Sequence, residues 1–130
     1  MEQDALKIRP DLWYGLICAL PPQEYRDVVS LIGVANELVA PEFPYSKDLY
    51  IVVAWQQGFG TFQFHMRITD EDGNVLGETD PFPVVMELLG NQLTLPYKFI
   101  VHTTGTYLFE GFLDGEATFK TILRISRRAQ

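Results

Sequence analysis

The residues with the clearest metal-ligand spacing lie in an acidic turn. Asp70, Asp72 and Asn74 occupy positions 1, 3 and 5 of a possible calcium loop, and oxygen ligands at that spacing suit Ca²⁺. The rest of the pattern is missing, because Val75 stands where the loop needs glycine and Pro81 stands where it needs glutamate. A polar hairpin turn with one glycine at positive φ explains the same residues. We therefore predict a turn here and keep the three residues as a calcium candidate.

The two histidines form no metal-binding motif. His65 is expected on the polar face of a strand beside Arg67, exposed or facing a shallow groove, and His102 ends another strand. Neither an H-x-H nor an H-E-x-x-H pattern occurs, and one cysteine cannot build a cysteine-ligated zinc site. We expect surface or hydrogen-bonded histidines, and we predict no cofactor.

The sequence also offers little for nucleophilic catalysis. Ser30 and Cys18 fall inside apolar strands, where a reactive group is hard to reach, and no serine lies in a nucleophile-elbow motif. The glycines at 58 and 60 are too close together for a phosphate-binding loop and precede no helix. Carboxylate pairs such as Glu110 and Glu116 exist, but their convergence across a cleft cannot be derived from the sequence. We predict that the protein is not an enzyme, and a site assembled only in three dimensions remains the alternative.

Aromatic residues at predicted turns favour a binding role. Phe43 and Tyr45 lie in a proline-rich loop, and Phe59 falls at another turn. Such residues either form a partner surface at one end of a sandwich or close the open end of its core. We expect Phe43 to be buried and Tyr45 to be exposed. The predicted interaction surface has four members: Tyr45, Phe59, His65 and Arg67.

These observations leave two classes of function. The first is a non-enzymatic protein-interaction or structural module, whose partner is an unknown protein or a second copy pairing along an edge strand such as Glu116–Ser126. The second is a sandwich that binds a small ligand, carbohydrate or lipid, through Trp13, Trp55 and Tyr97. Trp55 continues an alternating apolar pattern, so we expect it in the core.

Strands must position these residues, because period-2 alternation dominates the chain. The clearest run is Phe62–Ile68, where apolar residues alternate with Gln63, His65 and Arg67. Further strands are predicted at Leu12–Leu20, Val28–Val34, Leu49–Trp55, Val84–Leu89, Leu93–Val101, Tyr107–Leu113 and Phe119–Ile125. Asp114-Gly115 predicts a type I′ hairpin turn. We predict an all-β protein, a single-domain antiparallel β-sandwich of immunoglobulin-like or C2-like type over residues 1–130, with about 8–9 strands.

Composition limits the partners. The 130 residues carry a net charge of −7, which argues against nucleic acid and against an anionic membrane surface. The apolar run Leu12–Leu20 follows acidic residues, so we interpret it as a buried strand instead of a signal peptide. We therefore expect a cytoplasmic protein in which Cys18 is a small buried thiol.

The order of the motifs resembles an uncharacterised family of small bacterial β-sandwich proteins. The resemblance rests on five segments in succession: Ser30–Val34, Pro41-Glu42-Phe43-Pro44, Leu49–Trp55, Ile68–Gly73 and Gly105-Thr106-Tyr107, followed by a final hairpin. It extends from about Leu12 to Ile125. It implies a sandwich fold and a bacterial source, and it supplies no catalytic residues.

Overall fold

The structure is a computed structural model that describes residues 6–25, 28–30 and 33–128. This part of the chain contains strands and no helix, so none of its segments is a helix that could span a membrane. The strands are β1 (Asp11–Cys18), β2 (Gln23–Tyr25), β3 (Val28–Ser30), β4 (Glu37–Ala40), β5 (Tyr45–Gln56), β6 (Gly60–Thr69), β7 (Val75–Glu78), β8 (Phe82–Met86), β9 (Asn91–Val101), β10 (Gly105–Leu113) and β11 (Glu116–Arg127).

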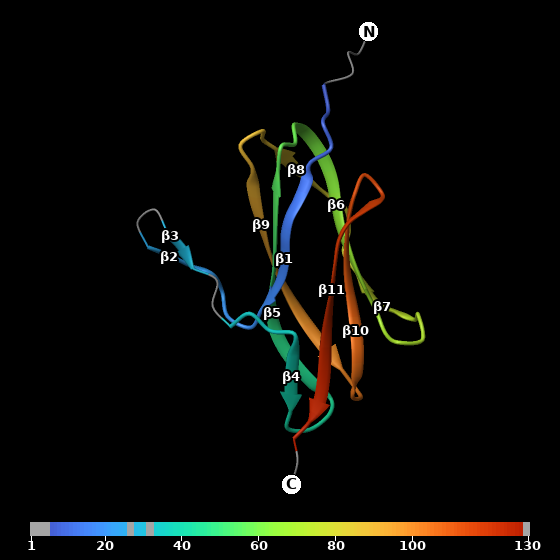
Figure 1. Ribbon diagram of the computed structural model, residues 1–130. Helices are drawn as coiled ribbons and strands as arrows, with labels where there is room; N and C mark the ends of the chain where they lie inside the picture. Colours follow the sequence, from blue (N-terminus) through green and yellow to red (C-terminus); the bar gives the residue numbers. More distant parts are fainter. Residues whose placement is uncertain (1–5, 26–27, 31–32, 129–130) are drawn as a thin grey trace.

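The strands build two main sheets that face each other (Figure 1). One sheet has the order β1-β5-β9, and the other has the order β4-β11-β10-β6-β7, with β8 also paired to β6. The β2–β3 ribbon projects away from both sheets (Figure 1). The predicted all-β sandwich is thus confirmed, with nine strands in the two main sheets. One pair departs from the antiparallel rule, because β4 runs parallel to β11.

The core forms because the alternating faces of the strands meet between the sheets. In β6 the apolar residues predicted to point inward are all buried, and their neighbours are exposed or half-buried. Trp55 is fully buried, as its alternation predicted, and its ring packs edge-on against Phe64 at a centroid distance of 5.8 Å. Its indole Nε1 donates a 2.8 Å hydrogen bond to Oγ1 of Thr118, so the buried polar atom has a partner.

The Phe119 ring lies between the two sheets, in a space that exists because Gly111 and Gly15 have no side chains. A Cβ placed on Gly111 of β10 would overlap the Phe119 ring, and one on Gly15 of β1 would lie 2.7 Å from its Cδ2. The ring stacks on Phe64 at 6.4 Å with an interplanar angle of 5°. Two glycines on different sheets therefore allow one large aromatic ring to fill the space between them.

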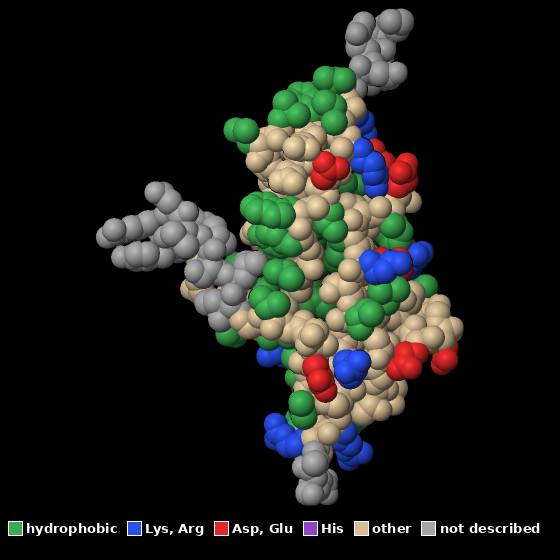
Figure 2. Space-filling model, viewed as in Figure 1, with side chains coloured by type: hydrophobic (Ala, Val, Ile, Leu, Met, Phe, Trp, Pro, Cys, Tyr) green, Lys and Arg blue, Asp and Glu red, His purple; other side chains and the backbone are tan. Residues whose placement is uncertain are grey.

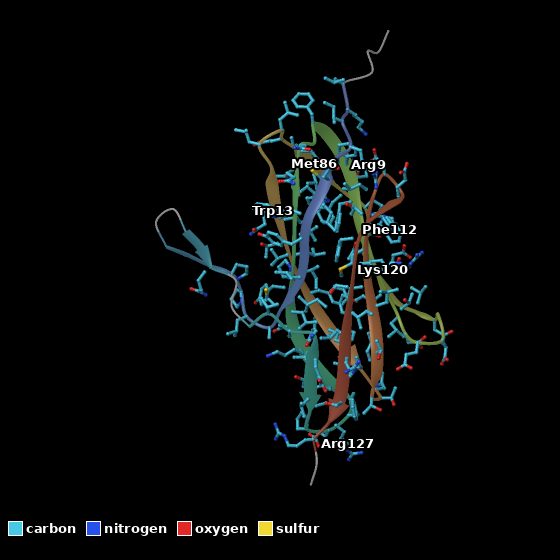
Figure 3. All side chains as sticks on the ribbon, in the orientation of Figure 1. Arg9, Trp13, Met86, Phe112, Lys120 and Arg127 are labelled. Atoms are coloured by element: carbon cyan, nitrogen blue, oxygen red, sulfur yellow. The ribbon has the colours of Figure 1, made fainter. Side chains whose placement is uncertain are left out.

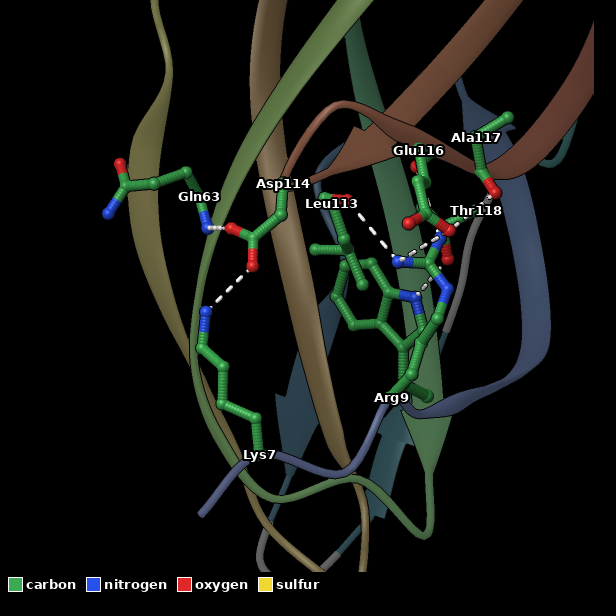
Figure 4. A network of polar contacts seen from close by, with 9 residues as sticks. Lys7, Arg9, Gln63, Leu113, Asp114, Glu116, Ala117 and Thr118 are labelled. Atoms are coloured by element: carbon green, nitrogen blue, oxygen red, sulfur yellow. Dashed lines mark hydrogen bonds and ion pairs between the residues drawn. The ribbon is translucent and has the colours of Figure 1, made fainter. Parts of the chain in front are cut away.

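The β10–β11 hairpin has the predicted turn, and the segment before β1 is tied to it. Asp114 and Gly115 have φ values of 49° and 84°, as a type I′ turn requires. The Asp114 carboxylate accepts a 2.8 Å hydrogen bond from the Gln63 amide and a 2.7 Å bond from Lys7 Nζ (Figure 4). The Arg9 guanidinium donates to the carbonyls of Leu113, Glu116 and Ala117 at 3.2–3.3 Å.

Two predicted elements differ from the structure. β8 ends at Met86, so Leu88 and Leu89, predicted to lie in a strand, belong to the turn before β9. The final strand is not a free edge along its whole length, because Arg124–Arg127 pair with Glu37–Ala40 of β4. Edge-to-edge pairing of two copies along all of Glu116–Ser126 is therefore blocked at its C-terminal part.

Candidate functional site

The predicted interaction residues do not form one surface. Tyr45 begins β5 and Phe59 follows its end, so the strand separates them by roughly 35 Å. Tyr45 is half-buried and packs against the core beside Phe43, although we expected it to be exposed. Phe43 is half-buried as well, so the structure shows neither the full burial predicted for Phe43 nor the exposure predicted for Tyr45. The reason is that both aromatic residues close the same end of the sandwich.

His65 and Arg67 come together on the outer face of β6, around Phe112 of β10. The His65 ring stacks on Phe112 at 4.7 Å with an angle of 11°, and the Arg67 guanidinium lies 4.8 Å from the centroid of the same ring. Each also faces a carboxylate: Glu78 lies 3.4 Å from His65 Nε2, and Glu110 lies 3.7 Å from Arg67. Lys120, labelled near Phe112 in Figure 3, completes this group 4.0 Å from Glu110. The group is paired within itself, as expected for a stabilising surface cluster.

The acidic turn uses its first carboxylate for its own backbone. Asp70 Oδ1 accepts 2.9 Å bonds from the amides of Asp72 and Asn74, and Oδ2 accepts from Asn74 Nδ2 at 3.2 Å. These bonds, that from the Asn74 amide above all, lower the pKa of Asp70. The predicted polar turn is confirmed, with Gly73 at a φ of 84°. Within the described ranges no group of three or more His, Cys, Asp or Glu is arranged to hold a metal ion.

A cavity of about 350 Å³ lies between this turn and the β9–β10 turn. It brings His102 near the acidic turn, a proximity that the sequence did not reveal. Its walls are held by structural bonds: Glu71 accepts a 2.7 Å bond from the Thr106 amide, and the Tyr107 hydroxyl donates to the Thr103 carbonyl at 2.7 Å. The Glu71 carboxylate therefore fixes the two turns to each other, and the Tyr107 hydroxyl fixes the β9–β10 turn itself.

A cluster of exposed apolar side chains covers the end of the sandwich where Phe59 lies. We call it the apolar end, and its members are Leu6, Ile8, Phe59, Leu88 and Leu89. Backbone hydrogen bonds hold these segments side by side: Ile8 and Phe59 exchange two at 2.9 Å, and the Gln57 amide donates to the Leu88 carbonyl. Leu89 is fully exposed, and Figure 2 shows apolar atoms gathered at this end. Of the predicted residues only Phe59 belongs to it.

A second exposed region lies on the outer face of the β1-β5-β9 sheet. Trp13 on β1 is 66% exposed, although the run Leu12–Leu20 was predicted to be buried. Figure 3 labels it on the side of β1 away from Phe112 and Lys120. The other two aromatic residues of the ligand-binding alternative lie elsewhere, since Trp55 is in the core and Tyr97 packs against it. The prediction that the strand is buried holds only for its last two residues, Ile17 and Cys18.

Comparisons with known proteins add little to this geometry. No protein-family model and no curated protein matches the chain, which is consistent with the resemblance to an uncharacterised family. Among solved structures, the chain is similar to the crystal structure of a beta-glucosidase from Listeria innocua in complex with isofagomine, with a TM-score of 0.47 and 10% sequence identity. The alignment covers 90% of this chain and 16% of that enzyme chain.

Proposed function

We propose that the chain is a non-enzymatic protein-interaction module that binds a partner protein through its apolar end. The observation that carries this proposal is the exposure of five large apolar side chains on three adjoining segments. Contiguous apolar surface of this kind is costly in water and marks interaction sites on soluble proteins. Burying a single leucine side chain contributes about 1.5–3 kcal/mol, so a few of them can anchor an interface.

The charge of the chain favours a protein over a membrane as the partner. A net charge of −7 repels the anionic lipids of a membrane surface. The carboxylates outside the apolar end support a binding role more than catalysis. Asp70, Glu71 and Asp114 each accept hydrogen bonds that hold turns together. The apolar end is also built on paired backbone segments, which makes it a preorganised surface.

We also propose that the protein works in a bacterial cytoplasm. The single cysteine, Cys18, is fully buried, as suits a reducing compartment where thiols carry no structural bridge. The bacterial source rests on the family resemblance alone.

Site-specific photocrosslinking tests the proposed surface. A photoreactive amino acid at Leu89 should give a discrete protein adduct in the source cells, whereas the same group at Ile122, which is 52% exposed on β11, should give none. Phe59→Ser should weaken the adduct from position 89. An adduct with twice the mass of the chain, together with a concentration-dependent dimer in sedimentation, would identify the partner as a second copy. No adduct at position 89, or equal adducts from both positions, would refute the proposal.

A further inference from the structure

The outer face of the β1-β5-β9 sheet carries ordered rows of side chains. The strand register places Tyr14, Ala54 and Gln92 in one row, and Cys18, Tyr50 and Pro96 in another row four residues along β5. In the first row the Tyr14 hydroxyl donates a 2.6 Å hydrogen bond to Oε1 of Gln92. This bond fixes the orientation of the Gln92 amide, so that its Nε2 is left to donate elsewhere.

Two hollows meet on this face. One, of about 250 Å³, is lined by Trp13, Tyr14 and Asn91, among others, and the other, of about 370 Å³, by Tyr50 and Thr94. Gln92 lines both, so the two hollows adjoin at this residue, and we call them together the groove. The two tyrosine rows are four residues apart, roughly 13 Å, which suits a short chain-like ligand better than a single ring.

Among the described residues, the lining of these two hollows is uncharged. Neither hollow includes an Asp, Glu, Lys, Arg or His, although 21% of the chain is charged. An ionic ligand would lose its hydration here without gaining a partner charge. A lipid chain would instead cover Nε2 of Gln92 without accepting a hydrogen bond from it. The lining therefore suits a ligand that is neutral, carries many hydroxyl groups and has apolar faces.

We propose that this groove binds a neutral oligosaccharide. A pyranose ring presents C–H bonds on its face and hydroxyl groups around its edge, so it can stack on the exposed ring of Trp13 and bond to the Gln92 amide. Tyr14 acts as a positioning residue, because its hydroxyl holds Gln92 in one orientation. The inference goes beyond protein docking at the apolar end, and the groove shares only Leu89 with that end.

Tryptophan fluorescence gives a direct test. The chain has two tryptophans, and Trp55 is fully buried, so quenching by acrylamide reports on Trp13. Hexasaccharides of glucose (α- and β-linked), mannose and xylose should be screened, with an oligogalacturonate as the charged control and a proline-rich peptide as a competing ligand class. At least one neutral sugar should protect Trp13, and the charged sugar should not.

Variants then assign the binding to the groove. In calorimetry, Trp13→Ala and Gln92→Ala should each weaken the affinity for the selected sugar about tenfold, and Tyr14→Phe about fivefold. Phe59→Ser at the apolar end should leave it unchanged, which separates this proposal from the docking proposal. The inference is overturned if no neutral sugar protects Trp13, if Trp13→Ala binds normally, or if only the peptide binds.

Discussion

Tyr14 and Gln92 lie on the two strands that flank β5, and their side chains join across Ala54 through a hydrogen bond of 2.6 Å. Ala54 is only 3% exposed although it points to the outer face of the sheet. A small residue on the central strand thus lets two long side chains from the outer strands meet, and the contact ties the edges of the sheet together.

Tyr14→Phe should lower the free energy of unfolding by about 0.5–1.5 kcal/mol, because it removes this one hydrogen bond and keeps the ring. Urea unfolding followed by circular dichroism measures the change. Tyr50→Phe on the same face is the matched control, since its hydroxyl has no hydrogen-bond partner among the described residues. Equal effects of the two substitutions would contradict a specific role for the Tyr14–Gln92 bond.

Gly111→Ala should destabilise the protein by about 1–3 kcal/mol, because its new methyl group overlaps the Phe119 ring. Combining it with Phe119→Leu should recover part of this loss, since the smaller side chain vacates the space that the methyl group needs. A double-mutant cycle by urea unfolding measures the coupling. Strict additivity of the two substitutions would show that the ring and the glycine are not in contact.

Thr118→Val should cost about 1–3 kcal/mol, because it leaves the buried indole N–H of Trp55 without an acceptor. Thr118→Ser keeps the hydroxyl and is the control. The same chemical denaturation experiment, followed through Trp55 fluorescence, should separate the two variants. A valine variant as stable as the unchanged protein would contradict this role of the hydrogen bond, because valine keeps the methyl group of threonine and lacks only the hydroxyl.

Acid should weaken the hydrogen bonds that Asp114 of the β10–β11 turn accepts from Gln63 and Lys7. The hydrogen bond from the Gln63 amide, followed by that from Lys7, lowers the pKa of Asp114 below its ordinary 3.8. The resulting stability is present above that value and is lost as the pH falls through the lowered pKa of the folded state. Asp114→Asn tolerates the positive φ and should therefore flatten the decline in stability between about pH 5 and 2. If Asp114→Asn leaves the decline in stability at low pH unchanged, or if Asp48→Asn at an exposed position flattens it equally, the assignment to Asp114 is wrong.

Alkali should destabilise the protein through three tyrosine hydroxyls and one thiol that are wholly or partly buried. Burial raises the pKa of Tyr14, Tyr97 and Tyr107 above 10.0 and that of Cys18 above 9.0. The folded state therefore favours the protonated forms of these groups. Their contribution to folding stability is complete below the ordinary pKa values and is lost as the pH rises through the raised pKa values of the folded state. Cys18→Ala should therefore flatten the pH dependence of urea stability above pH 9, because the ordinary pKa of the thiol, 9.0, is the lowest of the four. An identical slope in the variant would refute this assignment.

Local patterns were sufficient to predict much of the fold. The alternation in Phe62–Ile68 predicted which side chains of β6 are buried, and Asp114-Gly115 predicted the turn, since both depend on residues adjacent in the chain. The burial of Trp55 followed from the same two-residue period. These features need no knowledge of which strands are neighbours.

The candidate sites depended on strand order and could not be predicted in the same way. Trp13 is exposed at the point where the pairing of β1 with β5 shifts register, and Tyr45 is half-buried because its end of the sandwich closes around it. Leu88 and Leu89 continue an apolar run, so nothing local distinguishes them from a strand. The groove required the register that sets Tyr14 opposite Gln92, and that register comes from pairing between distant segments.

The parallel pairing of β4 with β11 has a consequence for the newly made chain. In the part of the chain that the structure describes, β4 pairs with β11 alone, and the register joins Glu37 to Arg124. β4 therefore leaves the ribosome long before β11 is synthesised. β5 and β6, in contrast, can pair with β1 and with β7 and β8 before β11 is made. During synthesis β4 therefore has no strand to pair with until β11 has been made, and its pairing is a late step that completes the sheet.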